Sequence, residues 1–502
     1  MSDILFGLGN ALNWINLIAA LLSVSAGILV GALPGLSAAM GVALLIPVTF
    51  GMPADTALIA LAGVYCGAIY GGSISAILLH TPGTSSAAAT AIDGYQLTLK
   101  GQAGKALGTA TIASFIGGIL STIALYLLSP PLAKLALSFG PSEYFWLSIF
   151  GLTIIAGVSS KSIIKGLLSG VIGLAISTVG MDPITGVARF TFGVRYLLDG
   201  VPFTAMLIGL FSMSQVLIMA EEKIKDKRKA KDLEDRVMLS WAEIKRIMPT
   251  CLRSTVIGTV TGILPGAGGT IAAYMGYNEA KRFSKNKEEF GHGSIEGIAG
   301  AEAANNAVTG GSLIPTLTLG IPGNSVTAIL LGGLIIQGMR SGPELFTSHA
   351  KITYTFFAGF AIVNIFMLIV GLLAGKHFAK VASVKDSILI PIVFGLSVIG
   401  SYSIYNRIFD VWVMLIFGII GYFVKKLDLN PAAMVLALIL GPIGESGLRR
   451  TLILSRGSYG AFFSSTVSWV LIVMSLVSLF SPMLMEKLAE GKAAKPKAEK
   501  SK

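Results

Sequence analysis

The sequence has little charge and few cysteines. Only 13% of its 502 residues are charged, whereas soluble domains carry about 25%. Mean hydropathy is +0.77, and apolar runs of about 18 or more residues recur along the chain, as membrane-spanning helices require. This composition excludes a sizeable soluble domain. It predicts an all-α polytopic membrane protein with roughly 10–12 spanning segments.

Motifs for catalysis and nucleotide hydrolysis are also missing. The two cysteines, Cys66 and Cys251, lie in or beside apolar segments without metal-ligand spacing. No G-x-x-x-x-G-K-[ST] phosphate loop occurs, which excludes an ATP-driven motor within this chain. No H-E-x-x-H occurs, and no G-x-S-x-G has a credible setting. We therefore predict no enzymatic activity, no transition metal and no cofactor.

Basic residues outnumber acidic ones and give a net charge of +12. They cluster in the predicted loops, which the positive-inside rule explains, so we expect contact with membrane lipid and none with nucleic acid. The long internal hydrophilic segment divides the chain nearly in half. We predict a first membrane repeat at 1–220, a basic cytoplasmic linker at 221–249, a second membrane repeat at 250–484 and a basic cytoplasmic tail at 485–502.

The two halves repeat two sequence elements in the same order, which is why internal repeats are sought first. "GALPGLSAAM" at 31–40 matches "GILPGAGGTI" at 262–271, an offset of 231. "GGSISAILLHTPGTSSA" at 71–87 matches "GGSLIPTLTLGIPGNSVTA" at 310–328, with the Pro-Gly pairs offset by 240. Each half thus contains an L-P-G element and, downstream, a G-G-S…P-G-x-S element. This order indicates a duplication.

Loop charges indicate that the two repeats have opposite orientations. In the first half the loop after L-P-G lacks Lys and Arg, and the loop after the second element is basic. In the second half this order is reversed, so equivalent loops would lie on opposite sides of the membrane. Arg449, Arg450 and Arg456 do not follow the rule. We predict inverted-topology repeats with re-entrant hairpins and broken helices.

Each repeat carries two Pro-Gly breaks at corresponding positions. Broken helices in a membrane occur inside protein or beside a water-filled cavity. One such break is usually a packing kink, but paired interruptions in both halves indicate a transporter's central site. The half-helix N-termini that follow would offer amides and a positive dipole end to a carboxylate. The predicted substrate-binding residues are Thr81, Pro82, Gly83, Thr84, Ser85, Pro322, Gly323, Asn324 and Ser325.

A second set of residues could bind a coupling cation or close a gate. It combines the two L-P-G tips with a polar helical face around Glu302, and ionisable residues within membrane segments tend to be functional. Two alternatives stay open: single hydroxyls can bond their own helix, and Glu302 can lie near a helix end among headgroups. The predicted cation or gate residues are Pro34, Gly35, Ser37, Pro265, Gly266, Gly268, Glu302, Asn305 and Asn306.

These motifs resemble the TctA family, the large membrane subunit of the bacterial tripartite tricarboxylate transporters. The resemblance is carried by "GALPGLSAAMGVALLIPVTFGM", "YGGSISAILLHTPGTSSAAATAIDGYQLTLKGQAGKALG", "GILPGAGGTIAAYMGYNEAKR" and "GGSLIPTLTLGIPGNSVTAILLGGL". It extends over nearly the whole chain. It implies a secondary transporter in the bacterial inner membrane, driven by a Na⁺ or H⁺ gradient. It also implies a small TctB-like membrane subunit and a TctC-like periplasmic solute-binding protein that delivers a small organic acid.

Residues and resemblance together predict carboxylate symport, with citrate as the name-giving example of the substrate class. The candidate site contains no Lys or Arg, so a cation carried with the substrate would neutralise it. A more distant likeness to elevator-type carboxylate transporters is an analogy of fold. The alternatives are a carboxylate transporter acting without a binding protein, a channel component and an embedded lipid-modifying enzyme. The last is disfavoured because no nucleophile or metal cluster is visible.

Overall fold

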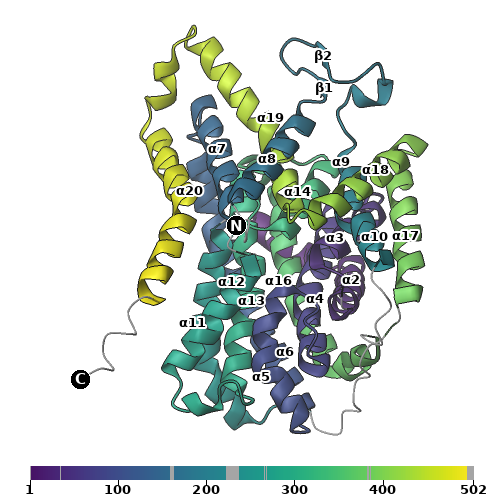
Figure 1. Ribbon diagram of the computed structural model, residues 1–502, viewed down its shortest axis with the longest axis vertical. Helices are drawn as coiled ribbons and strands as arrows, with labels where there is room; N and C mark the ends of the chain where they lie inside the picture. Colours follow the sequence, from purple (N-terminus) through teal and green to yellow (C-terminus); the bar gives the residue numbers. More distant parts are fainter. Residues whose placement is uncertain are drawn as a thin grey trace. The chain divides into compact units, whose positions relative to one another are not determined.

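The structure is a computed structural model that describes residues 2–33, 35–158, 163–221, 237–264, 266, 268–381, 384 and 386–493 (Figure 1). Within these ranges its regular secondary structure is helical apart from one short antiparallel strand pair. The segments long and apolar enough to cross a membrane number seven in the described chain. They are Trp14–Ala32, Ala54–Leu79, Ala103–Ala136, Phe203–Glu221, Ala350–Gly375, Ile408–Lys426 and Pro431–Leu454. The prediction of an all-α polytopic membrane protein is therefore confirmed.

The first of two compact units contains Met1–Leu137 and Pro202–Phe423. It draws on both halves of the sequence. Before residue 138 its elements are α1 (Ser2–Ala11), α2 (Trp14–Ala32), α3 (Ala38–Thr49), α4 (Ala54–Leu79), η1 (Ser85–Ala87), α5 (Ala88–Leu99) and α6 (Ala103–Ala136). From residue 202 they are α9 (Phe203–Leu207), the π-helical η3 (Ile208–Met213), α10 (Ser214–Glu221), α11 (Trp241–Ile263), α12 (Gly268–Phe283), η4 (Lys287–Glu289), α13 (Ile295–Leu319), α14 (Ser325–Ile336), α15 (Glu344–Thr347), α16 (Ala350–Val381), α17 (Asp386–Ser403) and most of α18 (Ile408–Lys426).

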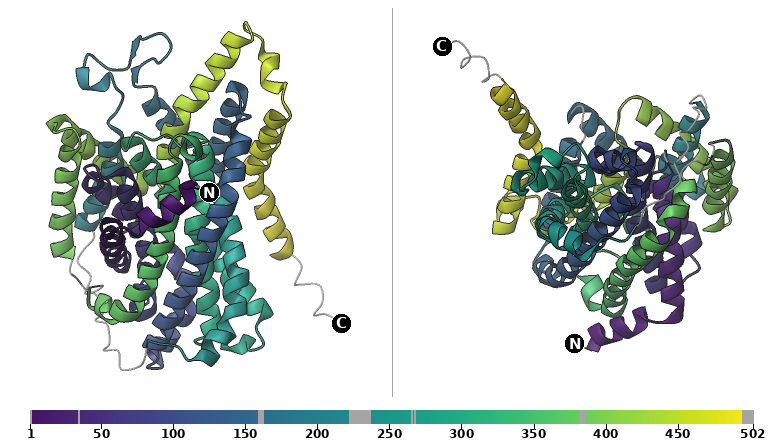
Figure 2. Two further views of the ribbon diagram at one scale, coloured as in Figure 1. Left: turned by 180° about the vertical axis from the view of Figure 1, so that it is seen from behind. Right: turned by 90° about the horizontal axis from the view of Figure 1, so that it is seen from below.

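The second unit contains Ser138–Val201 and Val424–Lys502. Its elements are α7 (Pro141–Val158), α8 (Ile163–Ser177), β1 (Gly180–Met181), β2 (Ala188–Arg189), η2 (Arg195–Leu197), α19 (Pro431–Leu454), η5 (Tyr459–Phe463) and α20 (Thr466–Ala493). Helices α7 and α8 both pack on α19, and α20 packs on α7. Figure 2 shows α19 and α20, in yellow, as the two arms of a hairpin.

Ion pairs in the second unit account for one of the arginines that break the charge rule. Arg449 contacts Asp182 at 2.6 Å and Glu445 at 3.1 Å, and Arg189 contacts Glu445 at 2.7 Å. The backbone N–H of Thr185 and the Arg449 guanidinium hold the pKa of the Asp182 carboxyl well below its usual range. Arg449 therefore stabilises the turn after β1, a role independent of membrane orientation.

In the first unit, the L-P-G element of the first half joins α2 and α3, and α2 runs parallel to the following α4. The glycines of these two helices show how closely the helices pack. A Cβ on Gly63 would lie against Ser23, and one on Gly71 would lie 2.4 Å from the carbonyl oxygen of Ile28. Contacts that advance together along both helices mean that the helices are parallel. Because α3 lies between them in the chain, α2 and α3 form a hairpin with the L-P-G element at its tip.

The second half repeats this arrangement with α11, α12 and α13, which lie side by side in Figure 1. A Cβ on Gly258 would meet Ala304, and one on Gly262 would meet Val308. Helices α11 and α13 are therefore parallel, with α12 between them in the chain. Small residues permit such close backbone contact where lipid gives no hydrophobic force between helices.

Helix α11 begins inside the segment predicted as a linker. A capping box starts it: the hydroxyl of Ser240 accepts from the N–H of Glu243, and the Glu243 carboxylate accepts from the N–H of Ser240. Glu243 also pairs with Lys105 at 2.6 Å. Residues 222–236 of the predicted linker, and 494–502 of the predicted tail, lie outside the described residues. Helix α20 continues to Ala493, past the predicted repeat boundary at 484.

Candidate functional site

The first broken helix is α4, which ends in a left-handed cap. His80 has φ 54°, and its N–H donates to the carbonyl of Ser75. The N–H of Gly83 then donates to the carbonyl of Gly72 at 3.2 Å. Thr84 and Ser85 follow, half-buried and exposed respectively, before the chain becomes helical again in η1 and α5. The break thus leaves hydroxyl groups at the start of a new helical segment.

The second broken helix, α13, has the same cap at the matching position. Gly320 has φ 72°, and its N–H donates to the carbonyl of Pro315, as His80 donates to Ser75. Gly323 packs on Gly262 and Ser312. The new helix, α14, begins differently from η1. Both polar atoms of the Asn324 side chain are engaged here, because Oδ1 accepts from the N–H groups of Val326 and Thr327 and Nδ2 donates to a tyrosine hydroxyl at 2.7 Å.

That tyrosine is Tyr65 of α4, which connects the two halves. Its hydroxyl lies 2.7 Å from Nδ2 of Asn324 and 3.1 Å from Oγ of Ser312, and the ring is fully buried. One position along, the thiol of Cys66 is 3.9 Å from Oγ1 of Thr309. Tyr65 therefore orients the residue that caps α14. The sequence offered one signal for it, since a phenol within a helix of mostly small residues needs a hydrogen-bond partner when buried.

The L-P-G tip of the second half lies between the two breaks. The N–H of Gly266 donates to the carbonyl of Gly323 at 2.8 Å, on the second break. Thr270, at the start of α12, donates its hydroxyl to Oγ of Ser85 at 3.0 Å, on the first break. A Cβ on Gly269 would lie 3.4 Å from Cβ of Ser86. The N-terminus of α12 therefore faces the hydroxyl-bearing segment η1.

The L-P-G tip of the first half packs against the first break, as the tip of the second half packs against the second. A Cβ on Gly83 would lie 2.0 Å from the carbonyl oxygen of Gly31, so this tip packs against the first break. Ser37 caps α3 by accepting from the N–H of Met40 at 3.2 Å. Helix α3 contacts α14 of the other half, as α12 contacts η1. Each L-P-G helix thus meets the broken-helix element of the opposite half.

Asn305 is the polar residue with no partner at this meeting point. Its side chain is 1% exposed, and neither Oδ1 nor Nδ2 has a hydrogen-bond partner among the described residues. A Cβ on Gly269 would lie 2.8 Å from Oδ1 of Asn305, so the amide oxygen faces the N-terminus of α12. Buried amides are nearly always hydrogen-bonded, and an exception calls for a ligand, ion or water. The N-terminal turn of α12, η1 and Asn305 form the candidate anion site.

Glu302 lies one turn before Asn305 and is completely buried in the protein. Thr90 of α5 donates to Oε1, and Ser114 of α6 donates to Oε2 at 3.0 Å. Asn306 donates from Nδ2 to Ser114 at 2.7 Å. Thr90 and Ser114 come from the first half and Glu302 from the second. Nothing in the local sequence of Thr90 or Ser114 indicates this contact, which depends on helix packing.

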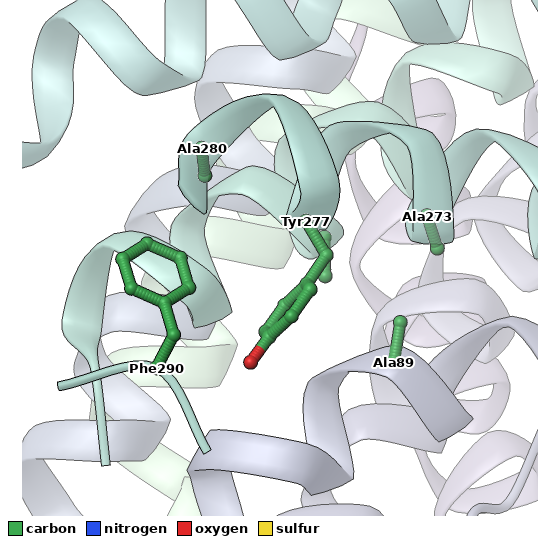
Figure 3. Packing of buried hydrophobic residues seen from close by; sticks show 6 residues of the cluster. Ala89, Ala273, Tyr277, Ala280 and Phe290 are labelled. Atoms are coloured by element: carbon green, nitrogen blue, oxygen red, sulfur yellow. The ribbon is translucent and has the colours of Figure 1, made fainter. Parts of the chain in front are cut away.

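A small hydrophobic cluster holds α5 against α12 beside this site. Figure 3 shows Ala89 of α5 facing Ala273 of α12, with Tyr277 and Phe290 packed alongside. The rings of Tyr277 and Phe290 meet edge to face at 5.5 Å. Next to them Oδ1 of Asp93 accepts from the N–H groups of the loop residues Gly291 and Gly293, at 2.8 Å each. The contacts of α5 with the second half are therefore both apolar and hydrogen-bonded.

The predicted residues fall into three groups. Those at the two breaks lie within or beside the meeting point, although Asn324 acts there as a helix cap and Thr81 and Ser85 are exposed. Glu302, Asn305 and Asn306 are buried on one face of α13. Of the L-P-G residues, Gly35 and Ser37 are exposed and Gly266 and Gly268 half-buried, whereas Pro34 and Pro265 lie outside the described residues. Ser325 is half-buried at the first position of α14.

A separate cavity of about 420 Å³ lies at the polar end of the same helices. Its charged groups are largely occupied with each other or with backbone: Arg246 contacts Glu289 and Glu296, and Lys100 donates to the carbonyl of His292. Lys105 holds the pKa of Glu243 down at about 2. Such mutual pairing stabilises the ends of α5, α6 and α11 and leaves the candidate site to the buried polar cluster.

Comparison with known proteins agrees with the motifs. Residues 17–436 match the model of the "Tripartite tricarboxylate transporter TctA family". An "uncharacterized 52.8 kDa protein in TAR-I ttuC' 3'region" of Agrobacterium vitis is 38% identical over 487 residues, 96% of each chain. A protein in the TAR-II ttuC' 3'region of the same organism is 38% identical over 227 residues, covering 45% of this chain and 94% of the relative. No solved structure gave a significant match.

Proposed function

Because the chain belongs to the TctA family of tripartite tricarboxylate transporters, we propose that it imports organic acids by cation symport, receiving them from a periplasmic binding protein. Family membership makes it the membrane subunit of a transport system, and its apolar helices make it a multi-pass membrane protein. The proposal adds the site, the substrate chemistry, the coupling and the inner-membrane location. A small membrane subunit and a binding protein are its expected partners.

The observation that carries the substrate site is the unsatisfied amide of Asn305 at the N-terminus of α12. The first N–H groups of a helix have no partner within it, and the helix dipole makes that end attractive to anions. The hydroxyls of Ser85, in η1, and Thr270, at the start of α12, are hydrogen-bonded to each other beside this helix end. The hydroxyls and the first N–H groups of α12 offer hydrogen-bond donors to a carboxylate, in the way that helix N-termini bind anions elsewhere. The amide of Asn305 adds an N–H₂ donor when it turns its nitrogen toward the anion.

Symport follows from what these groups can supply. The donors of the site are hydroxyls, amides and helix ends, each with at most a partial charge. A di- or tricarboxylate held by them keeps most of its negative charge, which is costly within the membrane. A cation carried in the same step lowers that cost. Two repeats of inverted topology around one site would provide alternating access.

The direct test is uptake by the complete three-component system reconstituted in liposomes. Asn305→Ala should weaken the apparent affinity for a labelled carboxylate by roughly 10- to 100-fold, because a hydrogen bond to a charged group contributes about 1.5–3 kcal/mol. The matched control is Asn364→Ala: this buried amide on α16 also has an unpartnered Oδ1 but bonds the carbonyl of Phe360. Equal affinity in wild type and Asn305→Ala, with gradient-independent flux, would overturn the proposal in favour of a channel.

A further inference from the structure

We propose that Glu302 carries the coupling proton of this symport. One proton joins the Glu302 carboxylate from the side on which the anion binds, crosses with the anion and leaves on the other side. This inference rests on the proposed function, because it names the ion and its binding group. The residues that hold the carboxylate are Thr90, Ser114 and Asn306.

Burial without a positive partner is the first observation. Glu302 is 0% exposed and lies two turns inside α13, away from the helix dipole at its start. Within the described residues it forms no ion pair, and its partners are the hydroxyls of Thr90 and Ser114. An ionised carboxylate costs several kcal/mol when removed from water without a counter-charge. The Glu302 carboxylate therefore needs a cation while it is buried away from water, as it is in this conformation.

The titratable groups around it do not supply that cation. From α4, the phenol of Tyr70 interacts with Glu302 electrostatically and bonds Oγ1 of Thr111 at 2.7 Å. On α5, Asp93 binds the backbone of the 291–293 loop. Among the basic groups on α6 and α11, Lys105 and Arg246 pair with glutamates at the polar end of the helices. Arg253 of α11 donates to Thr250 and lies over the ring of Phe283. The thiols of Cys66 on α4 and Cys251 on α11 are buried and carry no positive charge in either protonation state.

The hydrogen bonds favour a proton over a metal ion. Thr90 and Ser114 contact the carboxylate directly, so a sodium ion would have to push these oxygens apart. Asn306 turns its N–H₂ group toward Ser114 and Oε2, and an N–H donor repels a metal ion. A proton needs no such space. The protonated O–H donates to a neighbouring hydroxyl, and that hydroxyl turns its own hydrogen to a carbonyl of its helix.

The position of Thr90 connects this proton to the anion. Thr90 lies in the first turn of α5, directly after η1, which carries Ser85 and Ser86. Glu302 and Asn305 are three residues apart on one helical face, so the same segment of α13 bears the proton group and the unsatisfied amide. Binding at either place changes the contact of α13 with the segment η1–α5. The two ligands are therefore coupled through shared helices.

A second buried carboxylate provides an internal comparison. Asp410 is 1% exposed, and in the part of the chain that the structure describes neither of its carboxylate oxygens has a hydrogen-bond partner. It lies in the first turn of α18, where the helix dipole favours an anion, and Arg407 attracts it. Asp410 therefore has a positive charge nearby and no hydroxyl donors, whereas Glu302 has two hydroxyl donors and, within the described residues, no ion pair. The comparison makes Asp410→Asn a control for Glu302→Gln.

The experiment uses proteoliposomes of the complete system with the membrane potential clamped at zero. Three quantities are measured: accumulation of labelled carboxylate under a pH gradient, exchange of labelled for unlabelled substrate, and proton entry on substrate addition. At one proton per anion, one pH unit drives about tenfold accumulation in wild type. Glu302→Gln should lose accumulation and proton entry and retain exchange. Asp410→Asn should keep all three.

Each other outcome counts against the inference or confirms it. Sodium-driven accumulation without proton entry in wild type, or proton entry retained in Glu302→Gln, overturns it, as does loss of coupling in Asp410→Asn. Should Glu302→Gln fail to fold, Thr90→Val and Ser114→Ala remove donors to the carboxylate and should raise the pH of half-maximal exchange; unchanged profiles in both overturn it. Wild type without uptake or exchange overturns the proposed function itself.

Discussion

The two broken helices share a backbone and differ in their side chains. Both α4 and α13 end in a left-handed cap whose N–H bonds the carbonyl five residues earlier, at His80 and Gly320. Both place a glycine, Gly83 or Gly323, against an L-P-G tip of the same half. After the first break hydroxyls are exposed, while after the second Asn324 uses its amide to cap α14.

This difference indicates that the side chains of the two halves have different roles. A duplicated backbone keeps the breaks in place, because their glycines and caps are needed in both copies. The side chains differ: Asn324 caps α14 after the second break, whereas we propose that the hydroxyls after the first break contact the ligand. The halves also differ at Glu302 and Asn305, because the matching stretch of the first half carries no acid or amide.

The largest expected effect is a loss of stability when a methyl group is added to the closely packed glycines at the two breaks. In Gly83→Ala the new methyl would lie 2.0 Å from the carbonyl oxygen of Gly31, a backbone atom that cannot rotate away. Overpacking costs about 1–3 kcal/mol, and we expect the upper end of that range here. Gly323→Ala should cost somewhat less, because its nearest atoms lie at 2.6 and 2.7 Å. Thermal unfolding in detergent gives both values.

Gly395→Ala is the control for this pair, since a Cβ there would meet nothing within 4 Å. We expect it to be neutral or slightly stabilising, as alanine favours helix more than glycine does. If Gly83→Ala and Gly323→Ala unfold at the temperature of this control, the breaks are loosely packed. The shared backbone would then not explain their duplication.

A smaller effect separates ligand contact from helix capping. Asn324→Ala should lower stability by about 1 kcal/mol, the usual cost of losing an N-cap, and should leave carboxylate affinity nearly unchanged. Ser85→Ala should do the reverse: stability within about 0.5 kcal/mol of wild type, with affinity lowered roughly tenfold or more by loss of a hydrogen bond to a charged group. Unfolding and equilibrium binding on the same samples provide the comparison. Weaker binding in Asn324→Ala at full stability would place the anion at the second break.

Much of this arrangement could be predicted from the sequence, and the part that could not depends on packing. The Pro-Gly pairs, which occur in the same order in both halves, predicted the breaks because adjacent residues determine the local backbone conformation. The L-P-G tip of the second half was a candidate, but its position between both breaks follows from α12 packing on η1. Thr90, Ser114 and Tyr65 were missed for the same reason, since their partners lie 188 to 259 residues away.

The smallest effect concerns the caps themselves. His80 occupies the left-handed conformation that Gly320 adopts freely, and a left-handed L-residue costs about 1–2 kcal/mol. Its imidazole ring, however, packs on the ring of Tyr95, with 4.6 Å between the ring centroids. His80→Ala loses the ring contact and keeps the strain, whereas His80→Gly loses both. The difference in unfolding free energy between these two variants therefore isolates the strain and should be about 1 kcal/mol in favour of glycine. Equal stabilities would mean that the first cap relaxes without its imidazole, so that the two breaks share a backbone only while His80 is present.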